Sequence, residues 1–158
     1  MIKIIKIPED RKNVLKSCIK DLEKMTHTKI KVENNLAEID GEALNVWKTK
    51  DVIIAIGRGF SPMNSFQILE DGKSLEVINL KKLLKTKRNI QRIKSRIIGC
   101  DGKSRKKIEE LTNSKISVYE KTVSIISDAE NMPKIKKGIE MIINGVRHVK
   151  VYKYLEGD

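Results

Sequence analysis

The sequence predicts an α+β protein made of two small, similar domains, each with a three-stranded sheet packed by helices. Three observations lead to this prediction. Short β-branched segments alternate with segments of helical spacing, and the order strand–helix–strand–strand–helix occurs twice. A related stretch also recurs, as Thr26–Val32 (THTKIKV) and 86 positions later as Thr112–Val118 (TNSKISV). The 158 residues suffice for two small domains, and with 4% aromatic residues their cores must rest on Ile, Leu and Val.

Hydrophobic periodicity assigns the elements of the first half. Ser61 and Pro62 are a typical N-cap and first-turn pair, so a short helix should begin there. Trp47, the only tryptophan, is expected in the core or between domains, with an exposed anchor for a protein partner as the less favoured alternative. The expected elements are a strand at 2–7, a helix after Pro8, strands at 28–34 and 36–40, and helices at 43–56 and 62–69.

The second half repeats this order, but its first helical segment is interrupted by a glycine loop. Together the two halves predict an internal duplication with domains at 1–70 and 74–158, joined by a hinge at 70–73. The expected elements are a strand at 75–80, a helical pattern at 81–98 broken near 86–89, a loop at 99–102, a helix at 103–111, strands at 115–120 and 122–127, and a helix at 132–144.

The charge predicts an anionic partner. The 33 Lys and Arg exceed the 21 Asp and Glu, and residues 81–107 hold twelve basic residues with Asp101 as the single acid. A run of nearly one sign that ends in a glycine-rich loop favours nucleic acid over a merely solvated face. A membrane-surface helix would need bulky aromatic anchors, which this segment does not contain.

Other classes of site are disfavoured. Cys18 and Cys100 match neither a disulfide framework nor a zinc spacing, and they should stay reduced. His27 and His148 lie outside any metal-ligand spacing, and no carboxylate cluster suggests a nuclease metal site. We therefore expect no cofactor and no metal. Without a secretory signal or a long apolar run, a cytoplasmic protein with no membrane partner is expected.

The loop after Arg96 could bind either a single nucleotide or a nucleic-acid strand. Gly102-Lys103-Ser104 resembles the end of a phosphate-binding loop, but that motif needs glycine where Ile97 stands, and it follows a strand rather than a helical pattern. A nucleotide-hydrolysing enzyme is therefore disfavoured. An isoleucine pair, then Gly-x-x-Gly, a basic helix, two strands and a helix is instead the order of a type I KH (K homology) module.

The physics of such a loop is direct. Glycines allow close approach of a sugar-phosphate backbone, and the helix from Lys103 directs free N–H groups and its positive dipole end at a phosphate. Ile97 and Ile98 are expected to form an apolar floor under bases, and Asp101 is expected to cap the helix. The predicted RNA-binding residues are Arg96, Ile97, Ile98, Gly99, Cys100, Asp101, Gly102, Lys103, Ser104, Arg105, Lys106 and Lys115.

The sequence also resembles the archaeal and eukaryotic Dim-two (partner of Nob-one) family of tandem KH-domain ribosome-assembly factors. The resemblance covers residues 4–155, and its specific stretches are IGRGFSP (56–62), LEVINL (75–80), RIIGCDGKSRKKIE (96–109) and VYKYL (151–155). It implies binding of small-subunit (16S) rRNA near its 3′ end and a role in its maturation. It also implies contact with assembly proteins (a Nob-one-type endonuclease, an rRNA dimethyltransferase) or with the alpha subunit of archaeal initiation factor two.

The first half departs from a working KH module. Where its loop should fall, residues 7–13 read IPEDRKN, with no glycine and with acids that would repel a phosphate. The resemblance likewise implies a degenerate first domain that serves packing or protein contacts. The favoured function is thus non-enzymatic RNA binding in ribosome assembly. The alternatives are a general KH adaptor for RNA without ribosomal specificity, an enzyme acting on a nucleotide or rRNA, and a protein-interaction scaffold.

Overall fold

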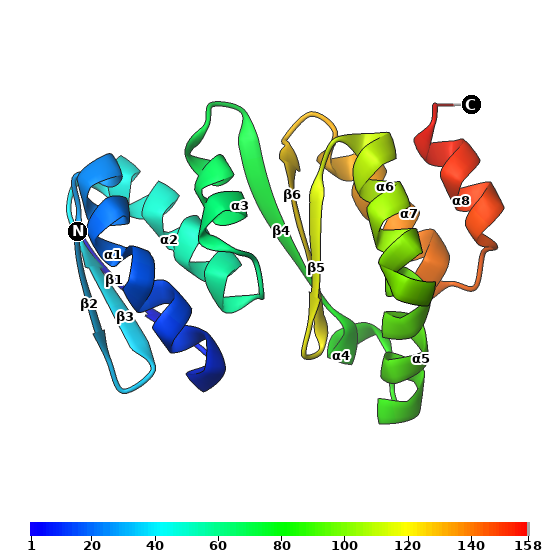
Figure 1. Cartoon of the computed structure of the whole chain (residues 1–158), viewed down its shortest axis with the longest axis horizontal. Helices are drawn as coiled ribbons and strands as arrows, with labels where there is room; N and C mark the ends of the chain where they lie inside the picture. The colour runs from blue at the N-terminus through cyan, green and yellow to red at the C-terminus, as the bar shows by residue number, and fades with distance from the viewer. Residues whose placement is uncertain (158) are drawn as a thin grey trace. The chain divides into compact units, whose positions relative to one another are not determined.

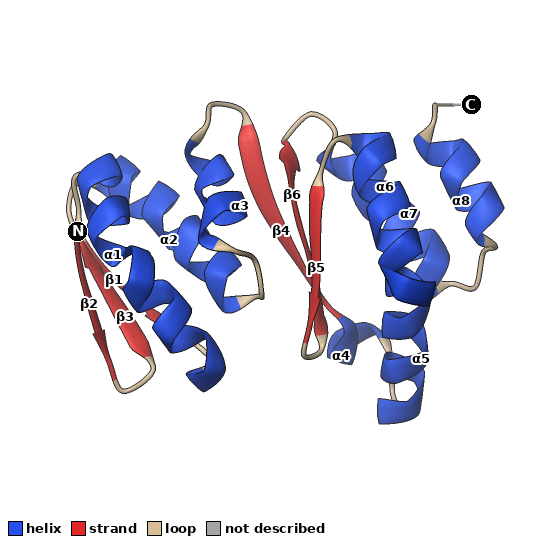
Figure 2. Ribbon diagram, in the orientation of Figure 1, coloured by secondary structure: helices blue, strands red, loops and turns tan. Residues whose placement is uncertain are grey.

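The computed structural model describes residues 1–157, which divide into two compact units, Met1–Lys73 and a second that begins at Ser74 (Figure 1). Each unit has one three-stranded sheet whose last strand in sequence lies in the centre. Helices pack on each sheet (Figure 2). The α+β class with two three-stranded sheets is therefore confirmed.

The first unit follows the predicted order. Its strands β1 and β2 both pair antiparallel with the central strand β3. On β3, Ala37 and Ile39 are fully buried while their neighbours are exposed, so one face of the sheet meets the helices and the other meets solvent. Its elements are β1 (Ile2–Lys6), η1 (Glu9–Arg11), α1 (Lys12–Thr26), β2 (Lys29–Glu33), β3 (Leu36–Asp40), α2 (Ala43–Gly57), α3 (Pro62–Phe66) and η2 (Gln67–Leu69).

Two local expectations for this unit have opposite outcomes. Ser61 caps α3 as predicted, accepting a hydrogen bond from the Asn64 N–H at 3.1 Å. Trp47 is not a core residue, because its side chain is 49% exposed. The Lys50 ammonium lies 3.9 Å from the centre of its ring, so a cation–π contact and helix α2 hold the indole at the surface.

The second unit has the sheet order β4-β6-β5 and an isoleucine-rich core. The helical pattern after β4 breaks as expected: Thr86 is the N-cap of α5 and accepts the Asn89 N–H at 3.1 Å. Its elements are β4 (Lys73–Asn79), α4 (Leu80–Leu83), α5 (Lys87–Ile98), η3 (Cys100–Gly102), α6 (Lys103–Thr112), β5 (Lys115–Tyr119), β6 (Thr122–Asp128), α7 (Met132–Ile143) and α8 (His148–Leu155).

Helix α8 is an addition to the repeated pattern. Its Val151 and Leu155 are buried in the core of the second unit. Gly138 on α7 allows this contact, because a Cβ atom at that position would lie 2.9 Å from Leu155 Cδ2. The basic, aromatic C-terminal segment is thus part of the folded unit.

Matching hydrogen bonds agree with the predicted internal duplication. At the end of α1, the Thr26 hydroxyl donates to the carbonyl one turn earlier at 2.7 Å and lies 2.8 Å from the Thr28 hydroxyl. At the end of α6, 86 positions later, Thr112 and Ser114 repeat both contacts, each at 2.7 Å. The two copies therefore share a helix-to-strand junction atom by atom.

Candidate nucleic-acid interface

The loop between α5 and α6 is a tight turn with positive φ at three of its four residues. Helix α5 ends at Gly99, which has φ 76° and ψ 177°, and Gly102 has φ 75° and ψ 11°. Asp101 has φ 54°, which is unusual for a residue with a side chain. The Gly99 conformation is essentially restricted to glycine, so this part of the motif is required by the backbone.

Gly99 also lies against the first turn of α6. A Cβ atom there would be 2.7 Å from both the Cβ and the backbone nitrogen of Ser104. Ser104 is 4% exposed, and its hydroxyl has no hydrogen-bond partner in the described part of the chain. Ser104 therefore lies beneath the loop, so the structure does not support its predicted contact with RNA.

The predicted cap at Asp101 is wrong. The N-cap of α6 is Gly102 in the left-handed region, and no side chain caps this end of the helix. With φ 54° and ψ 28°, Asp101 does not adopt the extended backbone from which an N-cap side chain reaches the helix. The Lys103 N–H donates to the Cys100 carbonyl, whereas the N-cap residue supplies no side-chain acceptor for the next N–H groups of α6, so an anion fits this position.

Cations surround this helix end unevenly. Lys103, Lys106 and Lys107 are exposed, whereas Arg105 is half-buried. A shallow cleft between the end of α6 and the start of β5 has Lys106 and Lys115 among its lining residues, so two predicted cations meet there. Lys106 and Lys115 therefore line the same cleft, and their contact with RNA stays a prediction.

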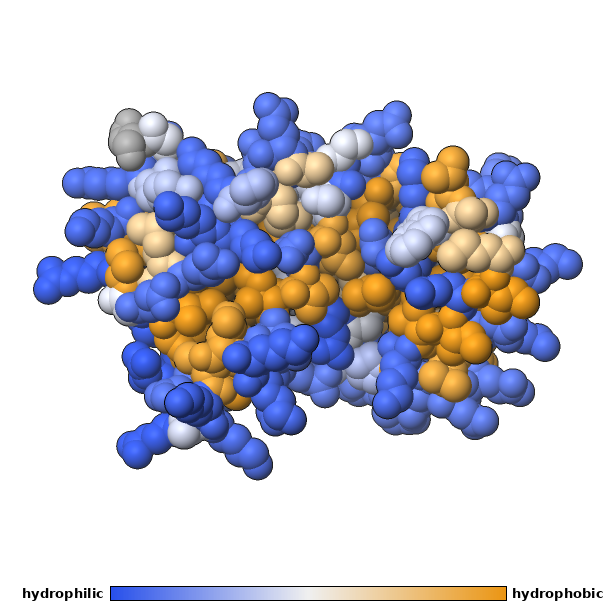
Figure 3. Space-filling view, turned by 180° about the vertical axis from the view of Figure 1, so that it is seen from behind, coloured by the Kyte–Doolittle hydropathy of each residue, from blue (hydrophilic) through white to orange (hydrophobic). Residues whose placement is uncertain are grey.

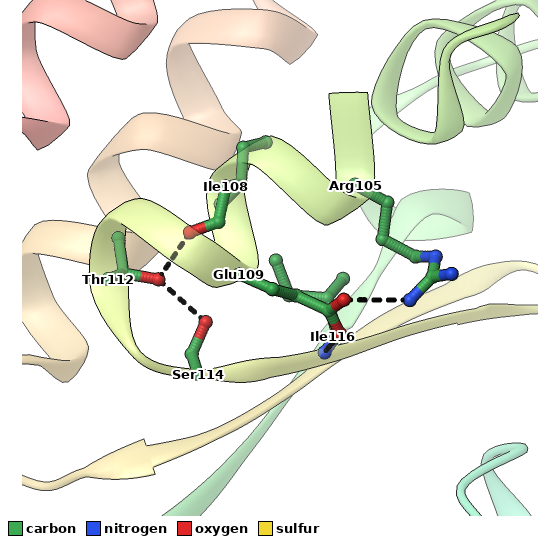
Figure 4. Close-up of polar contacts among 6 residues, drawn as sticks. All are labelled: Arg105, Ile108, Glu109, Thr112, Ser114 and Ile116. Atoms are coloured by element: carbon green, nitrogen blue, oxygen red, sulfur yellow. Dashed lines mark hydrogen bonds and ion pairs between the residues drawn. The ribbon is translucent and has the colours of Figure 1, made fainter. Parts of the chain in front are cut away.

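Arg105 is held by a carboxylate that the sequence reasoning missed. One oxygen of Glu109 accepts a hydrogen bond from Arg105 Nη1 at 2.9 Å, and the other accepts the Ile116 N–H at 2.8 Å (Figure 4). Glu109 thus joins α6 to β5 and fixes the guanidinium beside the edge of the sheet. The arginine keeps its other N–H groups for a ligand.

Comparison with the first unit shows which of the Glu109 and Arg105 contacts belongs to the fold shared by both units. There Glu23 accepts the Ile30 N–H at 2.8 Å, matching Glu109 and Ile116. The position that corresponds to Arg105 is occupied by Ile19. The glutamate therefore belongs to the fold of both copies, and comparison of the two repeats could have identified it, whereas the arginine occurs only in the copy with the glycine loop.

Replacement of Glu109 by alanine should lower the stability of the second unit by about 2 kcal/mol, because a backbone N–H and a half-buried guanidinium lose their partner. Glu109→Gln keeps one acceptor oxygen and should cost about half as much. Denaturant unfolding measures both, with the exposed neighbour Glu110→Gln as a control expected within about 0.5 kcal/mol of the unmodified protein. An alanine variant as stable as that control would contradict the framework role.

The isoleucine pair before the loop is divided between core and surface. Ile97 is completely buried in the core of the second unit, so its predicted role as a floor under bases is wrong. The spacing of Ile90, Ile93 and Ile97 places all three on the inner face of α5. Ile98 is half-buried and remains a candidate for apolar contact.

Arg96 faces the end of α7. Its Nη1 and Nη2 atoms donate to the carbonyls of Ile142 at 2.7 Å and Val146 at 2.9 Å. Its own carbonyl lies 2.8 Å from His148 Nε2 at the start of α8. Arg96 therefore ties α5, α7 and α8 together, and its contact with RNA stays a prediction.

In the first unit the counterpart of the loop lies later than residues 7–13. The 86-residue correspondence places Gly99–Gly102 opposite Asn13–Lys16, inside the continuous helix α1. The first unit has no counterpart of α5, because β1 leads through η1 directly into α1. The absence of a glycine loop is confirmed, but its cause is an uninterrupted helix rather than a repelling loop.

Helix, glycine loop and helix on a three-stranded sheet define a KH domain, an RNA-binding class. The family model for the second KH domain of PNO1, a "Eukaryotic type KH-domain (KH-domain type I)", matches residues 74–158. The chain is 38% identical to the KH domain-containing protein MJ0443 of Methanocaldococcus jannaschii, over 98% of this chain and 73% of that protein. The chain therefore belongs to the Dim2/PNO1 family of KH-domain RNA-binding proteins.

Solved structures agree with this assignment. Dim2p from Pyrococcus horikoshii is 38% identical, with a TM-score of 0.93 over 100% of this chain and 99% of that chain. A second structure, the a/eIF2alpha-aDim2p-rRNA complex from the same organism, matches at 38% identity and a TM-score of 0.91, covering 99% and 92% of the two chains. A protein of unknown function from Aeropyrum pernix matches at 32% identity and a TM-score of 0.93, covering 99% and 89%.

Two features of residues 1–157 concern metal binding and membranes. No three His, Cys, Asp or Glu side chains in this range come together in a way that could hold a metal ion. No helix in the same range has the length and apolar character needed to span a bilayer.

Proposed function

We propose that the second KH domain grips single-stranded 16S rRNA near its 3′ end, and that the protein acts without catalysis in small-subunit assembly and rRNA maturation. The observation that carries this proposal is the uncapped N-terminus of α6 behind a loop that only glycine can form at Gly99. A phosphate at this helix end would meet first-turn N–H groups that no N-cap side chain satisfies, the helix dipole and the Lys103 ammonium.

The proposed specificity for rRNA is supported by similarity to a relative and not by the loop itself. A KH cleft takes about four nucleotides, too few to identify one site in an RNA. The Pyrococcus horikoshii relative was solved with rRNA and a/eIF2alpha. We extend both ligands to this chain: rRNA for the second domain, and a protein such as the initiation-factor subunit for the first domain, whose loop counterpart is a continuous helix.

A charge reversal in the loop tests the RNA site. The double variant Cys100→Asp/Lys103→Asp places two acids at exposed positions beside the helix N-terminus. Its affinity for a single-stranded fragment of the 16S rRNA 3′ end should fall at least about a hundredfold at moderate salt. Fluorescence anisotropy across a salt series, without ATP, measures this loss.

A matched control separates the loop from net charge. Ser17→Asp/Lys20→Asp on α1 changes two exposed residues and the net charge by the same amount. It should bind RNA with nearly unchanged affinity. Equal binding by the loop variant and this control would remove the loop from the RNA site, and tighter binding of an unrelated single strand than of the rRNA fragment would favour a general KH adaptor.

A further inference from the structure

A second basic surface lies on α4 and the first turns of α5, and we call it the α4–α5 basic face. Its residues are exposed, and none forms an ion pair within the described part of the chain. No acidic residue occurs in the sequence between Glu76 and Asp101. Unpaired positive charge is thus concentrated there by Lys81, Lys82, Lys85, Lys87, Arg88 and Arg92.

On α5, the burial of one side of the helix in the core determines which side chains belong to the basic face. Ile90 and Ile93 are buried, whereas Lys87, Arg88 and Arg92, which lie before and between them in the sequence, are exposed on the outer side of α5. In the view from behind, hydrophilic side chains project from the lower end of the second unit, where Figure 1 places α4 and the start of α5 (Figure 3). The fold therefore exposes Lys87, Arg88 and Arg92 on one helix, directly after the exposed lysines at 81, 82 and 85.

This surface is separate from the glycine loop. Helix α5 runs from Lys87 to Ile98, so its first residue lies about 16 Å from the loop at a rise of 1.5 Å per residue. A phosphate bound near Lys87 is consequently a different one from a phosphate at the N-terminus of α6.

The composition of the face points to a ligand class. Residues 80–98 contain no Phe, Tyr, Trp or His on which an unpaired base could stack. Lysine and arginine without stacking partners suit the regular phosphate backbone of a duplex, which is recognised by shape and charge rather than by base edges. Resting on the proposed function, we infer that the α4–α5 basic face binds the backbone of a double-helical RNA segment that flanks the single strand held at the loop.

The test uses the full chain and three RNAs that share one single-stranded hexamer: the hexamer alone, the hexamer joined to a hairpin stem, and the hexamer joined to an unstructured tail with as many nucleotides as the stem. The variant is Lys87→Gln/Arg88→Gln/Arg92→Gln. On the stem-linked RNA it should lose about tenfold in affinity, and the slope of log affinity against log salt should fall by about two to three. On the hexamer alone its affinity should stay within about twofold of the unmodified protein, because that RNA meets only the loop.

The control is Lys16→Gln/Lys20→Gln/Lys24→Gln, which removes the same charge from exposed positions of α1. It should bind all three RNAs as the unmodified protein does. The inference is overturned if this control loses as much affinity as the α5 variant, or if the α5 variant loses as much affinity for the tail-linked RNA as for the stem-linked RNA. It is also overturned if the unmodified protein binds the stem-linked RNA no more tightly than the hexamer alone, as expected for a face that binds an acidic protein. Failure of the loop proposal looks different, because the unmodified protein would then not bind the hexamer alone.

Discussion

Gly99→Ala should destabilise the second unit by roughly 2–4 kcal/mol and reduce RNA affinity at least about tenfold. Two costs combine at this position. The backbone has φ 76° and ψ 177°, and the new methyl group would lie 2.7 Å from the Ser104 backbone nitrogen. Relief of that contact must move the first turn of α6, whose N–H groups are the proposed phosphate site.

Substitutions at two other glycines separate the cost of the backbone conformation from the cost of the close contact with Ser104. Gly102 has φ 75°, but a Cβ atom there would have its nearest neighbours at 3.9 Å, so Gly102→Ala should cost only about 1–2 kcal/mol from the left-handed backbone. Gly72 has φ 80° with nothing within 4 Å, and it lies outside the loop. Gly72→Ala should therefore show a similar small cost with unchanged RNA binding. Chemical denaturation and RNA anisotropy on the three variants give the ranking, and a Gly99→Ala protein as stable as Gly102→Ala would contradict the close contact with Ser104.

The sequence predicted the order of the elements because that information is local. Apolar spacing and β-branched runs mark each helix and strand, and Ser61 caps its helix by accepting the N–H of a residue only three positions later. The glycine loop was also predictable, since its spacing and the elements that follow occur together in one short stretch. Duplication strengthened the prediction, because two copies of the same order are less easily produced by chance than one.

The error at Asp101 arose where a local rule met a tertiary constraint, whereas the error at Ile97 came from a local periodicity that was overlooked. Asp101 has the chemistry of a helix cap, but the turn holds it at φ 54°, so its backbone differs from that of a capping residue. Ile97 and Ile98 read as a pair, yet one step around a helix is 100°, and only Ile97 joins Ile90 and Ile93 in the core. Here the periodicity of α5 already contained the correct answer.

Arg96 shows a limit of another kind. Its two acceptor carbonyls are 46 and 50 residues away in sequence, so no local pattern reveals them. In the first unit Arg11 makes the same arrangement, donating to the carbonyls of Ile56 at 2.8 Å and Phe60 at 2.6 Å. The two arginines are 85 positions apart while the surrounding framework repeats at 86, so alignment of the halves by sequence alone separates them.

Arg96→Met should consequently lower the stability of the second unit by about 2–4 kcal/mol, because two charge-assisted hydrogen bonds to the end of α7 are lost. Arg96→Lys should recover little of this, since an ammonium does not reproduce the planar fork that reaches both carbonyls. A chain of two units need not unfold in one step, so amide hydrogen exchange resolved by segment is the suitable measurement. Exchange should accelerate in α5, α7 and α8 and stay unchanged in residues 1–73.

The same variant decides between the two roles considered for this arginine. Under conditions where Arg96→Met remains folded, a purely structural role predicts RNA affinity within about threefold of the unmodified protein. A phosphate contact by Arg96 predicts instead that the variant lowers the slope of log affinity against log salt by roughly one unit. Arg11→Met provides the matched control, with its destabilisation confined to the first unit. If Arg96→Met kept full stability but lost tenfold in RNA affinity, the guanidinium would have to leave α7 for the RNA. The hydrogen bonds to Ile142 and Val146 would then describe only the unbound protein.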